Sequence, residues 1–271
     1  MLALYIILAL AVFALILYLF LIFPSVRKNH DIELLRGKYI AHRGLHDKND
    51  KHPENSMSAF SLALERNFPI ETDIHITRDD EVVVFHDSNT ERICKEKNII
   101  ENMTLEEVKK LRLCNTDEQI PTLKELLETV NGKVPLLIEF KCEDLKTSKR
   151  LCRAANAVLS EYKGKYLIQS FFPLVLSWYK KNRPDICRGQ LSSAFLKDKL
   201  HMRLLGCLVF NFLARPQFVS YECTYKDRFA YKICRFLGAF GAGWTIRSKE
   251  TLFAALGDYD AYIFEDFDPE Q

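Results

Sequence analysis

The fold is decided by the stretch Ile70-Glu-Thr-Asp-Ile-His-Ile-Thr-Arg-Asp-Asp-Glu-Val-Val-Val-Phe-His86. It contains two strand-like runs, Ile70–Ile76 and Val82–His86, joined by only five residues. A parallel crossover needs about a dozen residues or more, so the second run must return antiparallel to the first. The two runs therefore predict a hairpin, and Val82–His86 does not count as one of the parallel strands.

From about residue 38 onward, short apolar runs alternate with helical patterns, which is typical of α/β proteins with a parallel sheet. The remaining strand-like runs are Tyr39–His42, Leu136–Lys141, Tyr166–Gln169, Cys187–Leu191, Phe218–Tyr221, Ala239–Thr245 and Ala261–Glu265. Helical patterns lie at Ser56–Arg66, Leu105–Leu111, Leu123–Val130, Ser148–Tyr162, Leu174–Lys181, Asp198–Leu213, Lys226–Leu237 and Lys249–Leu256. About eight strand–helix units in roughly 230 residues match a (β/α)8 barrel. The sequence thus predicts an α/β fold, a (β/α)8 TIM barrel over residues 39–271.

An apolar segment precedes the barrel. Leu2–Phe23 has no charged side chain, and as a helix it measures roughly 33 Å, enough for a bilayer core of about 30 Å. A cleaved signal peptide would have a basic start, a shorter apolar run and small residues at the cut. This segment has no Lys or Arg at its start and ends in Leu-Ile-Phe-Pro. We therefore expect an uncleaved transmembrane anchor over residues 1–24.

The charges after this segment predict its orientation. Arg27, Lys28, Arg36 and Lys38 fall within an expected juxtamembrane linker, residues 25–38. Basic residues beside a span favour the cytoplasmic side. We expect a single-pass protein of the cell membrane with its catalytic domain in the cytoplasm.

The composition excludes several classes of protein. The net charge is +2, with 48% apolar and 27% charged residues. This balance excludes a disordered chain and a strongly basic nucleic-acid binder, so no nucleic-acid partner is expected. The eight cysteines contain no C-x-x-C pair, which disfavours a structural zinc site. We interpret them mainly as buried apolar residues, which favours a reducing compartment.

Ionisable side chains stand where the predicted strands end, and a barrel of this kind carries its active site at the carboxyl ends of its strands. Glu71 and Asp73 are two residues apart and share one face of a strand, as do Glu139 and Lys141. Carboxylates that converge there are tolerated if one divalent cation lies between them, and their oxygens suit Mg²⁺ or Ca²⁺. The alternative is that they form buried ion pairs with Arg or Lys.

Two histidines are candidates for acid and base, because imidazole titrates near neutral pH. His42 ends the first strand and His86 ends the hairpin strand, whose reverse turn brings it back toward Glu71. Arg43 and Lys141 would supply positive charge for an anionic group, most plausibly a phosphate. Together with a carboxylate-bound metal, these groups suit cleavage of a phosphodiester.

The other five histidines have simpler interpretations. Four are expected to be solvated: His30, His46, His52 and His201. His75 shares a strand face with Glu71 and Asp73, so it lies either near the site or at the barrel rim.

An ordered series of short motifs runs through the barrel. It comprises His42-Arg43-Gly44, Pro53-Glu54-Asn55-Ser56 with Ala59-Phe60, Glu71-x-Asp73, His86-Asp87, Ile120-Pro121-Thr122-Leu123, Ile138-Glu139-x-Lys141, Gln169-Ser170-Phe171, Trp244-Thr245 and Asp260-Ala-Tyr-Ile263. In order and spacing this series resembles the glycerophosphodiester phosphodiesterase family, in particular its membrane-anchored bacterial-type members. The resemblance covers nearly everything from Tyr39 onward.

The resemblance implies a (β/α)8 barrel and divalent-metal hydrolysis of glycerophosphodiesters to glycerol 3-phosphate and an alcohol. It also implies roles for single residues: metal ligation by Glu71, Asp73 and Glu139, acid–base catalysis by His42 and His86, phosphate contacts from Arg43 and Lys141, and substrate-site contacts from Glu54, Asn55 and Trp244. Residues from about 87 to 119 correspond to a small insertion that caps the barrel mouth.

Two further possibilities remain open at this stage. One is a related phosphodiesterase that acts on membrane lipids, either hydrolysing lysophospholipids as a lysophospholipase D does or closing a cyclic phosphate. The other is a non-enzymatic, membrane-tethered binding module, which the intact histidines and carboxylates argue against. The apolar run Leu204–Leu213 is either a buried barrel helix or a segment that dips into the membrane.

Overall fold

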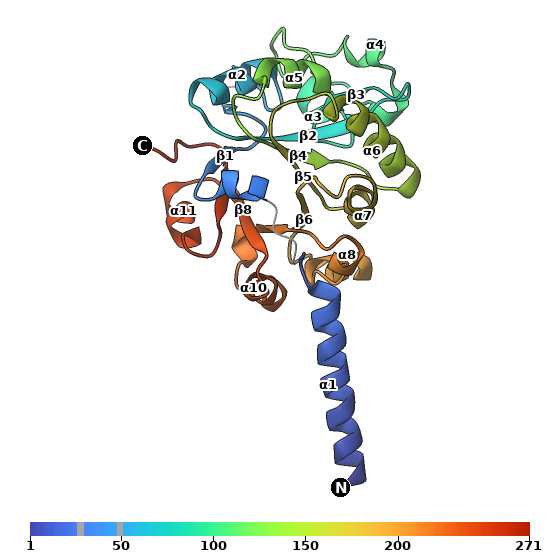
Figure 1. Ribbon diagram of the computed structural model, residues 1–271. Helices are drawn as coiled ribbons and strands as arrows, with labels where there is room; N and C mark the ends of the chain where they lie inside the picture. The colour runs from blue at the N-terminus through green and yellow to red at the C-terminus, as the bar shows by residue number, and fades with distance from the viewer. Residues whose placement is uncertain (26–29, 48–50) are drawn as a thin grey trace.

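The hairpin predicted at residues 70–86 is present and marks the start of a closed barrel (Figure 1). The computed structural model describes residues 1–25, 30–47 and 51–271. Around the barrel the strand order is β1-β9-β8-β7-β6-β5-β4-β2, all pairs are parallel, and Ala41 of β1 pairs with Ile70 of β2 to close the ring. The barrel strands are β1 Tyr39–Ala41, β2 Ile70–Ile76, β4 Leu136–Phe140, β5 Tyr166–Ser170, β6 Arg188–Ser192, β7 Phe218–Glu222, β8 Phe240–Ile246 and β9 Ala261–Phe264. The prediction of a (β/α)8 barrel is confirmed.

Helices cover the outside of the barrel. They are α2 Met57–Glu65, α5 Leu123–Val130, α6 Leu145–Leu159, α7 Pro173–Asn182, α8 Leu200–Gly206, α9 Asn211–Ala214, α10 Phe229–Phe236 and α11 Lys249–Ala255, with the 3-10 turn η3 Cys223–Tyr225 after β7. Side-chain caps explain several helix starts: Ser56 accepts from the amide of Ala59, and Thr122 and Glu125 form a capping box. The helices bury their apolar faces against strands that are themselves buried on both sides.

The amino-terminal end of the barrel is closed by a short turn within the expected linker. The 3-10 turn η1, His30–Leu35, buries Ile32 and Leu35 against residues at the strand starts, such as Phe218 and Phe240. The mouth at the opposite end of the barrel is therefore the one open to substrate.

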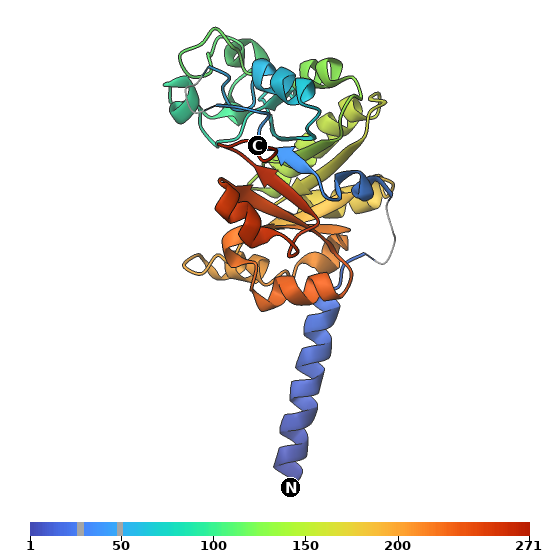
Figure 2. The same cartoon turned by 90° about the vertical axis from the view of Figure 1, so that its left-hand side faces the viewer.

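The segment after β3, Val82–Val84, forms a small unit with its own core. It contains α3 Glu91–Cys94, η2 Ile100–Asn102 and α4 Leu105–Val108, and its buried residues are Val83, Phe85, Ile93, Cys94, Ile100, Val108, Leu111, Leu113 and Ile120. Figure 2 shows it at the end of the molecule farthest from α1. The bond from the amide of Arg78 to the carbonyl of Met103 ties it to the hairpin turn.

The single helix predicted over Asp198–Leu213 is wrong. The chain forms α8 and α9 instead, with Leu208 between them in the left-handed region at φ 58°. Gly206 is the last residue of α8, and its backbone lies so close to the end of β6 that a Cβ would come within 2.6 Å of the carbonyl oxygen of Ser193. The apolar run Leu204–Leu213 had two possible interpretations, a buried barrel helix or a segment that dips into the membrane. In the structure Leu205 and Leu208 are buried, while Leu204 and Phe212 are exposed.

The apolar helix α1, Leu2–Ile22, stands away from the barrel and joins it at α9 (Figure 1). Asn211 donates to the carbonyl of Ile22 at 3.2 Å, and Arg215 donates to the carbonyls of Phe20 and Phe23 at 2.6 and 2.9 Å. Among the described residues, α1 is the one helix long and apolar enough to cross a membrane, a test that a signal sequence also passes. Arg27 and Lys28, two of the basic residues on which the predicted membrane orientation rests, lie outside the described residues.

Candidate active site

Three buried carboxylates converge between the neighbouring strands β2 and β4. Asp73 and Glu139 are cross-strand partners, and Glu71 lies two residues before Asp73 on the same face. One oxygen of each carboxylate lies within 4.8 Å of the others, and the three side chains are at most 7% exposed. The structure therefore brings together the three residues that the sequence proposed as metal ligands.

Lys141 neutralises only part of the negative charge of the three carboxylates. The Nζ atom of Lys141 lies 3.1 Å from Asp73 Oδ1 and 2.6 Å from Glu139 Oε1. Burial acts to raise the pKa of Asp73, but Lys141 and His86 outweigh it and hold that pKa well below its usual range. Burial and the neighbouring carboxylates raise the pKa of Glu71, and burial also raises the pKa of Glu139. The cluster thus combines partial ion pairing with unrelieved negative charge.

The donor set fits a hard divalent cation. Asp73 Oδ1 and Glu139 Oε1 are buried and accept no hydrogen bond of normal geometry from the described part of the chain. Their remaining neighbours are carboxylate oxygens, the ligands that Mg²⁺ and Ca²⁺ prefer. A cation between Glu71, Asp73 and Glu139 would supply the positive charge that this cluster lacks.

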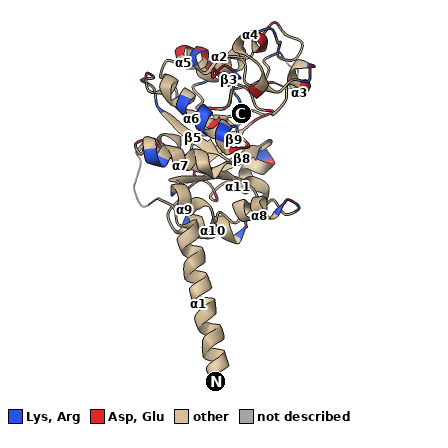
Figure 3. Cartoon of the chain, turned by 90° about the vertical axis from the view of Figure 1, so that its right-hand side faces the viewer, with Lys and Arg blue, Asp and Glu red and all other residues tan. Residues whose placement is uncertain are grey.

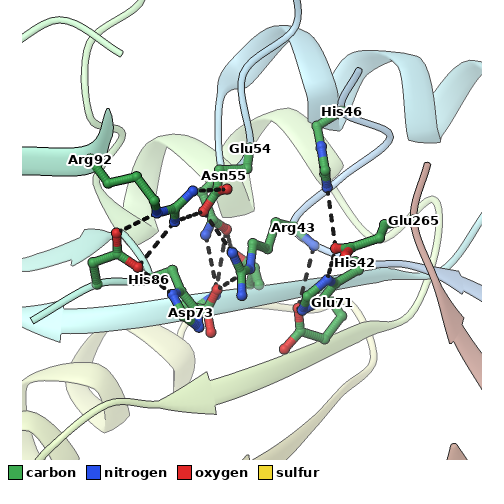
Figure 4. Close-up of polar contacts among 12 residues, drawn as sticks. His42, Arg43, His46, Glu54, Asn55, Glu71, Asp73, His86, Arg92 and Glu265 are labelled. Carbon is green, nitrogen blue, oxygen red and sulfur yellow. Dashed lines mark hydrogen bonds and ion pairs between the residues drawn. The ribbon is translucent and has the colours of Figure 1, made fainter. Parts of the chain in front are cut away.

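His42 is held by a carboxylate that sequence reasoning missed. Its Nδ1 forms a short hydrogen bond with Glu265, and its Nε2 lies 3.9 Å from Glu71 Oε2 (Figure 4). Burial lowers the pKa of His42 to about 4, against the opposing effect of Glu265. The neutral imidazole therefore donates its Nδ1 proton to Glu265 and points a free Nε2 lone pair at the cluster.

Glu265 follows β9, the neighbour of β1 in the closed ring. A carboxylate at the end of the predicted strand Ala261–Glu265 was the available signal, of the same kind as Glu139 near the end of its strand. His46 was expected to be solvated, and this is wrong: its side chain is 14% exposed and its Nε2 lies 3.6 Å from Glu265 Oε2. His30 and His201 are exposed as predicted, and His52 is half-buried.

His86 lies on the other side of the carboxylates from His42 (Figure 4). Its Nδ1 contacts Asp87 Oδ1 at 2.6 Å. His75, whose place was open, is buried next to it: its Nε2 contacts the carbonyl oxygen of His86 at 3.3 Å, and its Nδ1 contacts Glu101 at 2.7 Å. His75 thus lies beside the site and supports the backbone of His86.

The loop after β1 is tied to both the carboxylates and the capping insertion. Arg43 donates to Glu54 at 2.8 Å and its Nε lies 3.4 Å from Asp73. Asn55 donates from Nδ2 to Asp73 Oδ2 at 2.9 Å, which fixes the orientation of that carboxylate. From the insertion, Arg92 donates to Glu54 at 2.7 Å (Figure 4). Arg43 and Glu54 are therefore engaged with each other rather than free to meet a ligand.

A cavity of about 840 Å³ opens beside the cluster. His86, Glu139 and Lys141 line it together with Phe171. Trp244 packs edge-on against Phe171 with ring centroids 5.7 Å apart. The mouth thus has one charged side and one aromatic side, and the predicted residue Trp244 belongs to the aromatic side.

Buried hydrogen bonds continue behind Glu71. Gln169, at the end of β5, donates from Nε2 to Glu71 Oε1 at 3.1 Å and accepts from the hydroxyl of Ser220 at 2.6 Å. Gln169 belongs to the motif Gln169-Ser170-Phe171, for which no role was predicted. The contact suggests that it orients the Glu71 carboxylate.

Comparison with known proteins places the chain in a protein family. Residues 42–215 match the sequence model of the Glycerophosphoryl diester phosphodiesterase family. A glycerophosphodiester phosphodiesterase of Caldanaerobacter subterraneus subsp. tengcongensis is 33% identical over 176 residues, 61% of this chain and 70% of that protein. The chain belongs to the glycerophosphoryl diester phosphodiesterase family, so the resemblance seen in the motifs is confirmed.

Other relatives match over shorter parts. The Bacillus subtilis protein YhdW is 38% identical over 109 residues, 38% of this chain and 44% of YhdW. Human lysophospholipase D GDPD1 is 28% identical over 181 residues, 61% of this chain and 55% of that protein. The chain thus spans about half the length of these two relatives.

Solved structures share the fold. An Oleispira antarctica phosphodiesterase in complex with the product sn-glycerol-3-phosphate has a TM-score of 0.71 at 23% identity, covering 87% of this chain and 95% of that one. A glycerophosphodiester phosphodiesterase of Thermotoga maritima has a TM-score of 0.66 at 23% identity, covering 84% and 95%.

Proposed function

We propose that this protein is a membrane-anchored, metal-dependent phosphodiesterase that hydrolyses glycerophosphodiesters to glycerol 3-phosphate and an alcohol. The observation that carries the proposal is a cluster of three buried carboxylates in which His42 and His86 lie on opposite sides of Glu71 and Asp73 (Figure 4). Glycerol 3-phosphate as product is consistent with the ligand of the Oleispira antarctica neighbour.

Glu71, Asp73 and Glu139 would hold one divalent cation, Mg²⁺ or Ca²⁺. When bound, the cation would neutralise the phosphoryl oxygens and favour attack on phosphorus. Lys141 lines the cavity beside these residues and would add positive charge at the phosphate. Arg43 would act on the phosphate only after loosening its pairing with Glu54.

The surroundings of His42 and His86 differ, and we use this difference to assign the catalytic base and the catalytic acid. His42 is neutral with a free Nε2, so we assign it as the base that removes a proton from the attacking oxygen. His86 lines the cavity wall, and its Nδ1 is 2.6 Å from Asp87 Oδ1, a carboxylate that can hold the ring in place. We assign it as the acid that protonates the departing alkoxide. Trp244 and Phe171 would contact the apolar edge of the glycerol or alcohol.

A second substrate class is favoured by two observations. Relatives include human lysophospholipase D GDPD1, and α1 would hold the site near a membrane. The lipid-directed alternative is therefore a lysophospholipase D-type hydrolysis, or cyclisation by a hydroxyl of the substrate. Hydrolysis in ¹⁸O-labelled water places the label on phosphorus, whereas the initial cyclisation does not.

The test uses the full chain in detergent or vesicles with glycerophosphocholine and, separately, lysophosphatidylcholine. We expect release of glycerol 3-phosphate from the first substrate with Mg²⁺ or Ca²⁺, and its loss with a chelator. His42→Ala should abolish release, while His201→Ala, a change at an exposed histidine, should not. Lysophosphatidylcholine would give lysophosphatidic acid and choline instead. Absence of choline release from both substrates with both metals, or an active His42→Ala protein, would overturn the proposal.

We further propose that residues 1–24 anchor the protein in the cell membrane with the barrel on the cytoplasmic side. Arg36 and Lys38, close to the span, support this orientation. A reporter fused after Gln271 should be shielded from reagents added to intact cells, and labelling from outside would reverse the assignment.

A further inference from the structure

The side of the barrel that meets α1 carries large apolar side chains where a soluble protein normally has polar ones. Six of them are at least 36% exposed: Leu196, Leu200, Leu204, Phe212, Phe229 and Phe236. They lie in the loop before α8 and in α8, α9 and α10, the helices gathered around the end of α1 (Figure 3). These six residues form the anchor-side patch. A group of this kind is typical of an interaction surface.

Contacts at the end of α1 determine where the anchor-side patch lies relative to the bilayer surface. Tyr18 stacks on Phe229 with ring centroids 6.4 Å apart, and its hydroxyl donates to the carbonyl of Cys207 at 3.3 Å. Tyr18 precedes the end of α1 at Ile22 by four residues, or about 6 Å along the helix axis. A helix of 21 residues is about as long as the hydrocarbon core is thick. A span that uses all of α1 therefore puts Phe229 at the boundary between acyl chains and headgroups.

The helices beside α1 have the pattern of interfacial helices. Phe229, Lys232 and Phe236 share the outer face of α10, while Ala230 and Cys234 are buried against the barrel. The two Phe side chains are 66% and 89% exposed. Aromatic residues with a lysine between them suit a surface where the rings enter the lipid and the amine reaches the headgroups.

The charge of this region favours an anionic surface. Residues 195–237 contain eight Lys or Arg and three Asp or Glu, whereas the whole chain is nearly balanced at 38 and 36. Lys226, Lys232 and Arg235 pair with aspartates, and other cations of the region lie in the loop before α8 and in α8: Lys197, Lys199 and Arg203. Basic residues near a bilayer are attracted to anionic lipids. The same region thus offers apolar side chains for the acyl layer and cations for the headgroups.

An aromatic wall connects the patch to the active-site mouth. Phe195, next to Leu196, packs on Phe171 with ring centroids 6.0 Å apart, and Phe171 packs on Trp244 at 5.7 Å. Phe171 also lines the cavity beside the carboxylates. An acyl or alkyl chain lying along this wall would avoid exposure to water between the patch and the cavity.

We propose that the anchor-side patch rests on the leaflet that faces the barrel, around the Ile22 end of α1, with anionic lipid headgroups around its cations. Docking on this side turns the wall of Phe171, Phe195 and Trp244 toward the lipid. A lysophospholipid then reaches the carboxylates headgroup first while its chain keeps apolar contact. The preference for a lipid substrate rests on the proposed hydrolytic function, whereas the docking itself does not.

The docking is tested by fluorescence of the full chain in phosphatidylglycerol–phosphatidylcholine vesicles with brominated acyl chains. Leu200→Trp places a reporter in the patch. Leu145→Trp is the matched control: it is an exposed leucine at the start of α6, which lies away from α1 (Figure 1). Both variants retain the native Trp178 and Trp244. We expect brominated lipid to quench most of the fluorescence added at position 200 and none of that added at 145. Equal quenching at the two positions, or failure of the chain to float with vesicles, overturns the docking.

The consequence for substrate choice is tested with Leu200→Glu/Phe236→Glu. Loss of two apolar contacts should lower the rate on lysophosphatidylcholine in the same vesicles by about tenfold or more. The rate on soluble glycerophosphocholine should be unchanged, and Leu145→Glu should alter neither rate. Equal loss on both substrates, or loss on neither, refutes the assigned lipid route. If the parent protein hydrolyses neither substrate, the proposed function fails, and the quenching comparison still decides the docking.

Discussion

Exchange of Glu265 for glutamine should disable His42 by reversing its tautomer. Glu265 accepts at both carboxylate oxygens: Oε2 from His42 Nδ1 and Oε1 from Arg247 Nε at 2.7 Å. A glutamine has only one oxygen. Arg247 can only donate, so the amide oxygen is expected to face Arg247 and the NH₂ group to face His42. The imidazole must then accept at Nδ1 and carry its proton on Nε2, the atom that points at the carboxylate cluster.

The expected cost is that of losing a general base. Such a base contributes about 10²- to 10⁴-fold, so kcat for Glu265→Gln should fall by about that factor, equivalent to roughly 3–5 kcal/mol. KM should change little, because Glu265 is assigned no contact with substrate. The assay is release of glycerol 3-phosphate by the full chain at saturating metal, with kcat and KM measured separately.

A second substitution tests the tautomer itself. In Glu265→Gln/Arg247→Ala the glutamine is free to turn its oxygen toward His42, and part of the lost kcat should return. Arg247→Ala alone is the control; this side chain is 59% exposed, so its loss should have a small effect. An active Glu265→Gln protein, or a double variant no faster than Glu265→Gln, would refute the reasoning.

Three further predictions concern metal affinity, pH and packing. Asn55→Ala removes the hydrogen bond that orients Asp73 and should raise the metal concentration for half-maximal activity by about 10- to 100-fold; an unchanged metal titration would contradict this. Burial lowers the pKa of His42 from 6.5 to about 4, so the unfolded chain binds the proton first as the pH falls. With chelator present, the free energy of unfolding should therefore fall as the pH is lowered from 6.5 to about 4. Urea unfolding should show that His42→Gln removes roughly 3 kcal/mol of this decline. The same decline in the parent protein and in His42→Gln would contradict the prediction. Gly206→Ala brings a Cβ to 2.6 Å from the carbonyl oxygen of Ser193 and should cost about 1–3 kcal/mol, seen as a lower Tm.

Local sequence predicted the barrel because each of its strands is buried on both faces. Such strands appear as short, nearly continuous apolar runs, and the five-residue link after Ile76 left only an antiparallel return for the next run. The carboxylates were predictable for the same reason. Glu71 and Asp73 share a strand face by spacing alone, and Glu139 ends a strand with the same pattern.

The features that escaped prediction depend on contacts between distant segments. Glu265 meets His42 only because β9 closes the ring beside β1, 223 residues away. The helical pattern runs unbroken through Gly206 and Leu208, whereas the chain leaves the helix after Gly206, which lies against the end of β6, and turns at Leu208. Neither contact leaves a trace in the spacing of nearby residues.

The sequence left two interpretations of the carboxylates, a metal site and a set of ion pairs, and the structure combines elements of both. Lys141 pairs with Asp73 and Glu139, which accounts for the low pKa of Asp73. Glu71 has no such partner: it receives hydrogen bonds from the amide of Arg43 at 3.3 Å and from Gln169 at 3.1 Å, and its pKa is raised by burial and by the other two carboxylates. The ammonium group of Lys141 and the guanidinium of Arg43, which Asp73 shares with Glu54, therefore do not balance three buried carboxylates. A divalent cation beside Glu71 would restore the balance, and for that reason the ion pair and the proposed metal site are complementary parts of one arrangement.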